Sequence, residues 1–376
     1  MKYPNAKKFL LYLFITFTFF PFSVVLAELP KNTILFIGDG MGYQQVKAAG
    51  FYLNGKEGQF CFEKFPHKGQ VTTHSASSQI TDSAAAGTAI ATGVKVKNGV
   101  ISVRIPGDGS ELPSLLDYFR QEGKRVGLVS TAYISHATPA AFAAHTKSRN
   151  NNKDIISDYL ETRPYVLMGG AKYVSEESAL AGGYTVVTDL LELITLDLTR
   201  AGRVWGQFGR NHLPYEADGL GKLPHLSDMT LSALTILNRN SNGFFLMVEG
   251  ARIDHSGHGN NLKQNIFETI EFAKAVKKAV DWAGENEDTL IIVTSDHETG
   301  GMDVVRNNGK YKLPDVSWST KGHTGVNVPL YAWGVNAEKF EGVLDNTDFF
   351  RLITSEETSQ KDVSQKPAAE SVGLVD

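Results

Sequence analysis

Carboxylate and imidazole side chains follow four apolar segments of the sequence, each of which has the length and composition of a buried strand. The segments are 32–37, 126–131, 244–248 and 289–294, and the carboxylate and imidazole side chains that follow them are Asp39, His136, Glu249, Asp254, His255, His258, Asp296 and His297. The hydroxyl of Thr138 accompanies His136. Ligands of parallel sheets bind beyond the carboxyl ends of the strands. Converging carboxylates without compensation cost several kcal/mol per buried charge. The pattern therefore predicts a metal centre at one edge of a sheet.

The composition restricts which metal ligands are available. The 376-residue chain contains ten His but a single cysteine, Cys61, so neither an internal disulfide nor a thiolate zinc cluster can form. Imidazole and carboxylate groups suit zinc, whereas an all-oxygen set of Asp, Glu and Thr suits magnesium. The H-E-x-x-H motif of zinc proteases is absent. The glycine-rich turn at 38–42 reads G-x-G-x-G rather than G-x-G-x-x-G, which argues against a dinucleotide loop.

A potential nucleophile lies in the segment Thr81-Asp82-Ser83, which precedes an alanine-rich stretch to Ala91. We expect a helix to begin here, with Thr81 as a possible cap and Ser83 in the first turn. Exposed amides and the helix dipole favour an anion at such a position. An ordinary capping cluster is the alternative interpretation of these residues alone.

Strand-like segments alternate with amphipathic stretches throughout the body of the sequence, which is typical of an α/β protein with a parallel sheet. Leu112, Leu115, Leu116 and Phe119 form one helical stripe, and a second runs from Ile266 to Val280. We interpret 28–354 as one domain. The less regular segment from about 150 to 240 is predicted to be an insertion that decorates its core.

The two ends of the chain are predicted to lie outside this domain. Residues 1–27 have the basic start, apolar run and small-residue site of a signal peptide, with cleavage after Ala27. An uncleaved anchor is the alternative, because 19 largely apolar residues could span a bilayer. Cleavage predicts a periplasmic or secreted protein without stable membrane insertion. Residues 355–376 are predicted to form a flexible polar tail.

Net charge argues against nucleic acid as a partner. The full chain carries 37 Lys and Arg against 41 Asp and Glu, a net charge of -4. Removal of the leader, which contains three Lys and no acid, changes this to 34 minus 41, or -7. A mildly acidic protein is not attracted to polyanions in bulk, so we expect no specific nucleic acid binding.

Six blocks of the sequence, in order, resemble the motifs of the alkaline phosphatase family. They are Ile37-Gly38-Asp39-Gly40-Met41-Gly42, Thr81-Asp82-Ser83-Ala84-Ala85-Ala86-Gly87-Thr88-Ala89, His136-Ala137-Thr138-Pro139-Ala140, Val248-Glu249-Gly250-Ala251-Arg252-Ile253-Asp254-His255, Thr294-Ser295-Asp296-His297-Glu298-Thr299-Gly300-Gly301 and Gly322-His323-Thr324-Gly325. The blocks extend over about residues 32–335. The resemblance implies an α/β/α sandwich of three layers, with a mostly parallel central sheet.

The resemblance implies two Zn²⁺ and one Mg²⁺ per chain. Asp254, His258 and His323 resemble the ligands of one zinc ion. The second zinc ion corresponds to Asp39, Asp296 and His297, and would also meet the Ser83 oxygen. The magnesium site corresponds to Asp39, Thr138 and Glu249.

Substrate-binding roles follow from the same resemblance. Arg149, 11 residues after Thr138, occupies the place of the phosphate-binding arginine, and Asp82 would orient it. His136 and His255 would lie beside the third metal site, with His136 also near the substrate. Enterobacterial members have Asp and Lys at these two positions, and animal members have two His, so the identity of the third ion is open. The remaining His (67, 74, 145, 212 and 225) match no ligand position and are interpreted as structural or surface residues.

The predicted function is hydrolysis of phosphate monoesters at alkaline pH through a phosphoserine on Ser83. Metal ions would lower the pKa of the attacking hydroxyl, and in-line displacement at phosphorus would first form the phosphoserine and then hydrolyse it. The alternatives are a phosphodiesterase of the same superfamily and a non-catalytic periplasmic protein that binds metal or phosphate. The Cys/Ser-x-Pro-x-Arg motif of sulfatases is absent around Ser83. The resemblance further implies a homodimer.

Overall fold

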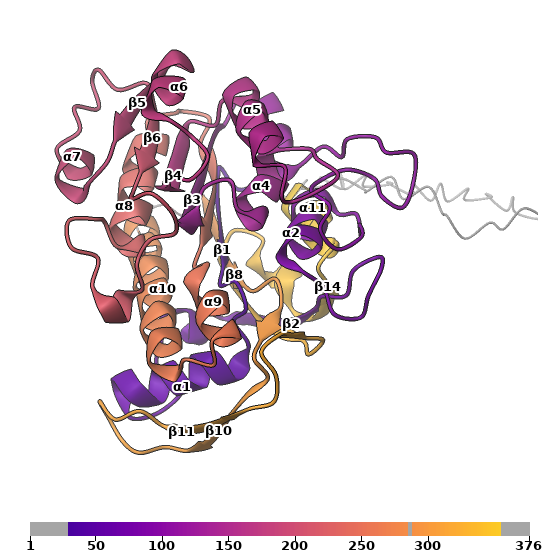
Figure 1. Ribbon diagram of the computed structural model, residues 1–376, viewed down its shortest axis with the longest axis vertical. Coiled ribbons are helices and arrows are strands. Elements are labelled where there is room, and N and C mark those ends of the chain that lie inside the picture. Colours follow the sequence, from indigo (N-terminus) through magenta and orange to yellow (C-terminus); the bar gives the residue numbers. More distant parts are fainter. Residues whose placement is uncertain (1–28, 285–287, 355–376) are drawn as a thin grey trace, which may run out of the picture.

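A ten-stranded sheet between two layers of helices forms the centre of the protein (Figure 1). The computed structural model describes residues 29–284 and 288–354. Along the sheet, the strands are β14 (Gly342–Asp345), β2 (His67–Thr72), β13 (Val328–Gly334), β8 (Thr289–Thr294), β1 (Asn32–Ile37), β7 (Phe244–Glu249), β3 (Arg125–Tyr133), β4 (Val166–Gly170), β6 (Arg203–Gln207) and β5 (Tyr184–Val187). Only β13 pairs antiparallel with its neighbours β8 and β2 among these strands. The predicted α/β/α class with a mostly parallel sheet is thus confirmed.

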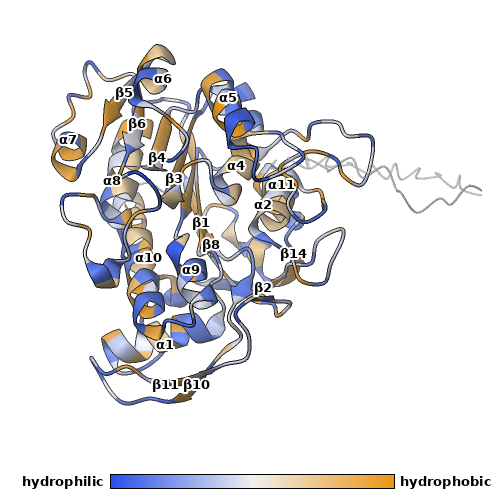
Figure 2. Cartoon of the chain, viewed as in Figure 1, coloured by the Kyte–Doolittle hydropathy of each residue, from blue (hydrophilic) through white to orange (hydrophobic). Residues whose placement is uncertain are grey.

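Central strands are buried and rich in apolar residues because both faces of the sheet are covered. All six residues of β1 are buried, and alternate side chains enter opposite cores. Ile34 and Phe36 face the layer of α1 (Tyr43–Asn54), α8 (Leu226–Leu237) and α10 (Leu262–Ala283). Leu35 and Ile37 face the other layer. Figure 2 shows the apolar strands between helices of mixed polarity.

The second layer contains most of the helices near the predicted site. It consists of α2 (Ser83–Thr92), α3 (Leu115–Gln121), α4 (Ala137–Ala143), α5 (Asn152–Thr162), α6 (Glu176–Ala181) and α11 (Asp348–Thr354). The stripe predicted at 112–119 is only partly helical, because Ser114 caps α3 and leaves Leu112 outside the helix, in a small satellite core. The second predicted stripe lies on α10.

The segment from about 150 to 240 differs from its prediction. It supplies β4, β5 and β6, which extend the central sheet at one edge, together with the short α7 (Leu190–Ile194) and the one-turn η2 (Glu216–Asp218). It is therefore part of the sandwich rather than a decoration. Strands of four or five residues separated by glycines carry too little periodicity to be recognised in the sequence.

Smaller elements complete the structure. The pair β10 (Met302–Arg306) and β11 (Asp315–Trp318) forms a separate hairpin, while β9 (Glu298–Thr299) pairs with β12 (His323–Thr324). The remaining helix, α9 (Arg252–His258), follows β7. The turn η1 (Phe62–Lys64) lies between α1 and β2, and η3 (Ala337–Phe340) lies between β13 and β14. No helix among the described residues is long and apolar enough to cross a bilayer. The predicted signal peptide and polar tail lie outside the described residues.

Candidate metal centre and nucleophile

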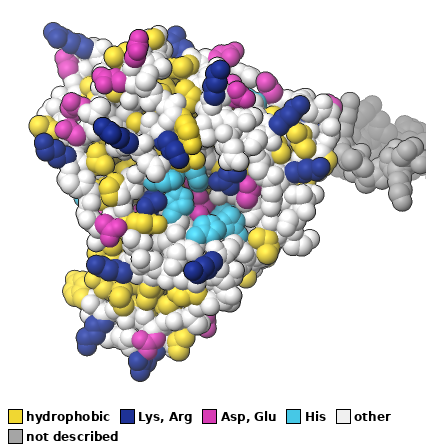
Figure 3. Space-filling view, in the orientation of Figure 1, with side chains coloured by type: hydrophobic (Ala, Val, Ile, Leu, Met, Phe, Trp, Pro, Cys, Tyr) yellow, Lys and Arg dark blue, Asp and Glu magenta, His cyan; other side chains and the backbone are white. Residues whose placement is uncertain are grey.

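Four adjacent strands deliver the predicted site residues to one edge of the sheet. Asp39 follows β1, Glu249 ends β7, Asp296 and His297 follow β8, and His136 caps the helix that follows β3. These strands lie in the order β8-β1-β7-β3, so their carboxyl ends are neighbours. Figure 3 shows histidines with acidic side chains between them near the centre of this face.

Glycine in the Asp39 turn permits close packing of this loop. Gly40 has φ +75°, and a Cβ there would lie 2.8 Å from both the Asp254 Cα and the Thr299 Oγ1. The turn therefore lies directly against α9 and β9, which carry other predicted ligands.

The first group of predicted ligands has spacings that suit a zinc ion. The Nε2 atoms of His258 and His323 are 3.2 Å apart, and they lie 3.3 and 3.5 Å from the Asp254 Oδ1. Ligand atoms bound tetrahedrally at zinc distances are about 3.3 Å from one another. Residues from α9 and β12 thus present three donor atoms in a triangle of the required size.

A second group surrounds the His297 ring. Its Nε2 lies 3.4 Å from the Asp39 Oδ1 and 3.3 Å from the Asp296 Oδ2, and all three side chains are fully buried. The same nitrogen lies 3.3 Å from the Ser83 Oγ. These spacings fit a zinc site that also faces the serine oxygen.

The third group is richer in oxygen. Asp39, Glu249 and His136 each offer a donor atom, and these lie within 4.8 Å of one another. Thr138 Oγ1, Glu249 Oε1 and both Asp39 carboxylate oxygens are buried without a hydrogen-bond partner. Ser130 donates to the other Glu249 oxygen at 2.5 Å and so fixes its orientation. Unsatisfied buried oxygens are costly, and a divalent cation would satisfy them.

The carboxylate pKa values show the electrostatic cost of this arrangement. Burial, followed by the Asp296 charge, raises the pKa of Asp39 well above its usual value. Burial also raises the pKa of Glu249 to about 7 and that of Asp296 to about 6. Burial opposes ionisation of Asp254 too, but hydrogen bonds with His258 and His323 outweigh it and hold its pKa well below the usual range. Cations placed among these groups would stabilise their charged forms.

Ser83 occupies the first position of α2, next to its cap. The cap is Asp82 rather than Thr81, because the Asp82 Oδ1 accepts a hydrogen bond from the Ala85 amide at 3.0 Å. Ser83 is 2% exposed, and its Oγ lies close to the second ligand group. The helix start thus places a hydroxyl beside the metal centre, at the end of the helix that favours anions.

Arg149 reaches the same place from a loop distant in sequence. Its Nη1 donates to the Asp82 Oδ2 at 3.0 Å, and its Nη2 lies 3.4 Å from the His136 Nε2. The Arg149 amide also donates to the Gly99 carbonyl at 2.7 Å, which anchors the loop. The guanidinium is therefore held at the edge of the site, where its planar fork could bind two oxygens of one phosphate.

His212 joins this site, although the sequence indicated no role for it. Its ring lies 4.5 Å from that of His255 and 5.8 Å from that of His136, between centroids. Arg252 in turn donates to the His255 Nδ1 at 2.9 Å. Burial lowers the pKa of His212 to about 3 and that of His255 to about 4, so both rings are neutral at physiological pH. A lone histidine in an irregular segment carries no sequence signal for such a contact.

Thr299 and Glu298 support the predicted ligands. The Thr299 Oγ1 donates to the Asp254 Oδ1 at 2.5 Å and lies 3.2 Å from the His297 Nδ1. Glu298 accepts hydrogen bonds from the Gln45 amide at 2.7 Å and from the Thr324 hydroxyl at 2.5 Å. Their position directly after His297 was the available signal, since the β9–β12 pair that they form connects two ligand groups.

The fold and the donor set define an α/β enzyme core with a site suited to divalent cations. The alkaline phosphatase family model matches residues 30–170, 168–315 and 302–357. Alkaline phosphatase 3 of Bacillus subtilis is 31% identical, over 86% of this chain and 88% of the relative. Alkaline phosphatase of Escherichia coli K12 is 30% identical, over 85% of this chain and 84% of the relative.

Solved structures agree with the sequence relatives. A cold-active alkaline phosphatase from Shewanella sp. superimposes with a TM-score of 0.79 at 30% identity, covering 86% of this chain and 99% of that structure. Alkaline phosphatase of the Antarctic bacterium TAB5 gives a TM-score of 0.79 at 31% identity, covering 87% and 98%. A histidine-to-aspartate mutant of the TAB5 protein carries Mg in its M3 site. The chain belongs to the alkaline phosphatase family, and it is a phosphatase.

Proposed function

We propose that this protein hydrolyses phosphate monoesters through a phosphoserine on Ser83, with two Zn²⁺ and one Mg²⁺ as cofactors. The observation that carries the proposal is the position of the Ser83 Oγ, 3.3 Å from the His297 Nε2 at the start of a helix. The Asp82–Arg149 pair lies at the same helix terminus. A nucleophile, an anion clamp and unsatisfied carboxylates thus meet at one place.

The donor sets assign each cation to a group of residues. We assign one zinc ion to Asp254, His258 and His323, and the second to Asp39, Asp296 and His297. Magnesium is assigned to Asp39, Thr138 and Glu249, with His136 and His255 beside it. When bound, these cations supply Lewis acidity, which stabilises anionic oxygens and compensates the carboxylate charges.

The chain's own residues then account for binding and transfer. Arg149 binds two phosphoryl oxygens with its guanidinium, which Asp82 holds in place. The Ser83 Oγ forms a bond to phosphorus as its proton passes to solvent, and the bond between phosphorus and the ester oxygen breaks. The leaving oxygen takes a proton from solvent and departs as the alcohol. Water then cleaves the phosphoserine, which restores Ser83 and releases inorganic phosphate.

An alkaline optimum is part of the proposal. Imidazole and carboxylate ligands bind metal only when deprotonated, so metal occupancy falls as the pH falls. The relatives are named alkaline phosphatases, which supports this choice.

Monoesters are favoured over diesters by the charge of the metal-loaded site. Two zinc ions and one magnesium ion bring six positive charges against the four carboxylates Asp39, Glu249, Asp254 and Asp296. The resulting excess of two, with Arg149 added, matches a phosphate dianion better than a diester monoanion. A phosphodiesterase of the same superfamily is the second candidate.

Location and assembly complete the proposal. We propose that residues 1–27 act as a cleaved signal peptide and that the protein is periplasmic or secreted. We further propose a homodimer, as implied by the resemblance to the family.

Turnover of a matched pair of aryl substrates tests this function. Metal-loaded protein is assayed with 4-nitrophenyl phosphate and bis(4-nitrophenyl) phosphate, before and after prolonged chelation. We expect the monoester to be hydrolysed much faster, and activity to disappear on chelation and return with zinc and magnesium. Faster turnover of the diester would favour the phosphodiesterase, and activity that survives chelation would exclude the metal mechanism.

A further inference from the structure

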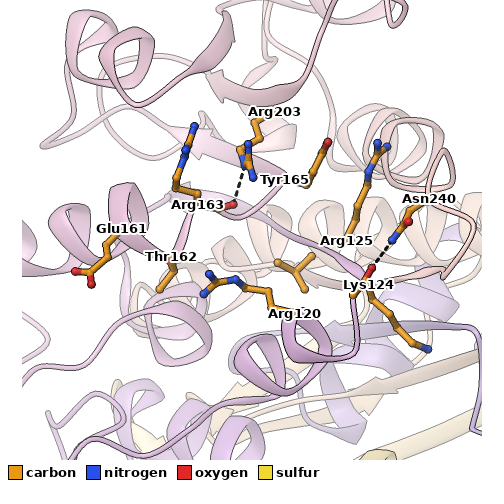
Figure 4. Close-up of a pocket in the computed structure, with 11 residues that line it drawn as sticks. Arg120, Lys124, Arg125, Glu161, Thr162, Arg163, Tyr165, Arg203 and Asn240 are labelled. Carbon is orange, nitrogen blue, oxygen red and sulfur yellow. Dashed lines mark hydrogen bonds between the residues drawn. The ribbon is translucent and has the colours of Figure 1, made fainter.

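A cationic cavity, drawn in Figure 4, lies at the amino-terminal ends of the parallel strands, whereas the metal centre lies at their carboxyl ends. It has a volume of 410 Å³ and is lined by the amino-terminal ends of β3 and β6, the residues before β4 and the ends of α3 and α5. Its charged and aromatic lining consists of Arg120, Lys124, Arg125, Arg163, Arg203, Glu161 and Tyr165. Because β3 has nine residues at about 3.3 Å each, about 25 Å separates this cavity from the metal centre.

The charge of this cavity contrasts with that of the whole protein. Five cationic side chains line it against one carboxylate, whereas the full chain has a net charge of -4. Figure 4 shows the Glu161 carboxylate pointing away from the other labelled side chains. These like charges outnumber the acidic groups at the cavity and repel one another, and an anion in the cavity would relieve that repulsion.

Two of the arginines are fixed in place by the protein. Arg125 donates from Nη1 to the Ile236 carbonyl at 2.9 Å, and its guanidinium lies 4.1 Å from the Tyr165 ring centroid. Arg203 donates from Nε to the Arg163 carbonyl at 3.1 Å and lies 5.1 Å from the same ring. Each bond uses one N–H of a five-donor group, so several donors stay available in a fixed position.

The other three cations differ in how far they are engaged. Arg163 makes no side-chain hydrogen bond or ion pair with any other residue in 29–284 or 288–354. Arg120 has a single ion-pair contact, 3.8 Å from Asp117. Lys124 donates to the Pro30 and Lys31 carbonyls at 2.8 and 2.9 Å, so it contributes mainly charge. Arg163, and Arg120 apart from its contact with Asp117, therefore keep guanidinium donors that the described residues do not engage.

We propose that this cavity is a second anion site, which binds a small phosphate-bearing molecule independently of the metal centre. Four guanidinium groups offer more donors than one carboxylate can accept, whereas a phosphate group accepts from several at once. The volume falls within the range of small-molecule sites. Inorganic phosphate, free or attached to a small organic group, is the shared chemistry.

Equilibrium dialysis with radiolabelled phosphate tests the second site directly. The metal-loaded protein is compared with an Arg120→Gln/Arg163→Gln variant at physiological salt. Lys278→Gln/Lys312→Gln serves as the control, because it removes the same charge from exposed lysines elsewhere. Turnover of an aryl phosphate and its inhibition by phosphate are measured in parallel, as is the thermal unfolding of each variant.

We expect wild type and the lysine variant to bind two phosphates per chain. The arginine variant should bind its second phosphate at least about tenfold more weakly, with unchanged turnover and unchanged inhibition by phosphate. Equal phosphate binding in wild type and the arginine variant, or equal losses in both variants, would overturn the proposal. Binding of each protein to phosphatidylglycerol vesicles is measured as well. If the arginine variant still binds two phosphates but loses vesicle binding that wild type shows, the cavity is a membrane contact and the proposal is overturned. If the proposed hydrolysis fails, turnover is absent, but the difference in phosphate binding between wild type and the arginine variant remains, so the two failures can be distinguished.

Discussion

Replacement of Thr299 by valine tests whether the protein positions its metal ligands as the geometry indicates. Thr299 is fully buried, and its hydroxyl donates to the Asp254 Oδ1 at 2.5 Å while lying 3.2 Å from the His297 Nδ1. Valine keeps the shape of the side chain and removes only the hydroxyl. The change therefore removes one hydrogen bond to a predicted ligand from each of two metal groups.

The size of the expected effect follows from the type of bond. A hydrogen bond to a charged group contributes about 1.5–3 kcal/mol, which corresponds to roughly a 10- to 100-fold change in an equilibrium constant. Loss of an outer hydrogen bond to a metal ligand typically weakens metal affinity by about the same factor. We therefore expect Thr299→Val to hold zinc about 10- to 100-fold more weakly than wild type.

Zinc affinity is measured by competition with a chromogenic chelator, and residual activity is followed in the same samples. Thr324→Val is the matched control, because the Thr324 hydroxyl donates to Glu298 within the same β9–β12 pair and not to a predicted ligand. Wild-type zinc affinity in Thr299→Val, or an equal loss in the control, would refute the reasoning.

Three further predictions concern other parts of the structure. Asp82→Asn should raise KM and the phosphate inhibition constant together, by about tenfold, because Arg149 loses its anionic partner. Asp82→Ala should also lose about 1 kcal/mol of stability, measured by denaturant unfolding, because the helix cap is missing. His212→Ala should weaken activation by Mg²⁺, whereas His212→Phe should restore it because the phenyl ring keeps the contacts with His136 and His255. Equal magnesium dependence in wild type and both variants would contradict this prediction. Burial raises the pKa of Glu268 from 4.5 to about 8, so its folded state binds the proton more tightly. The stability of wild type relative to Glu268→Gln should thus be greatest below pH 4.5 and be lost as the pH rises through about 8, and a pH-independent difference in melting temperature would argue against it.

The fold class and the strand ends could be predicted because both depend on local patterns. Buried parallel strands are rich in apolar residues, as 34–37 of β1 are, and their carboxyl ends share one edge of the sheet. Asp39, Glu249 and Asp296 come immediately after or at the end of such strands, so sequence alone indicated that they would converge. The six motif blocks then identified the family, which the family model and the relatives confirm.

Other features depend on contacts that sequence cannot report. His212 meets His136 and His255 only because the 150–240 segment folds back along the sheet, as β4, β5 and β6 extend it. Asp82, not Thr81, caps α2, a choice made by side-chain geometry among two adjacent capping residues. The cationic cavity brings together arginines from four separate places in the chain, none of which lies in a motif block. They are Arg120 in α3, Arg125 in β3, Arg163 directly after α5 and Arg203 in β6.

Detection of the covalent intermediate tests the central claim most directly. The metal-loaded protein is mixed with an aryl phosphate, quenched in acid and digested, and the peptide containing Ser83 is examined by mass spectrometry. We predict one added phosphoryl group on Ser83, absent from a Ser83→Ala variant that has also lost nearly all turnover. Full turnover in Ser83→Ala, or a phosphoryl group on another residue, would contradict the proposed mechanism.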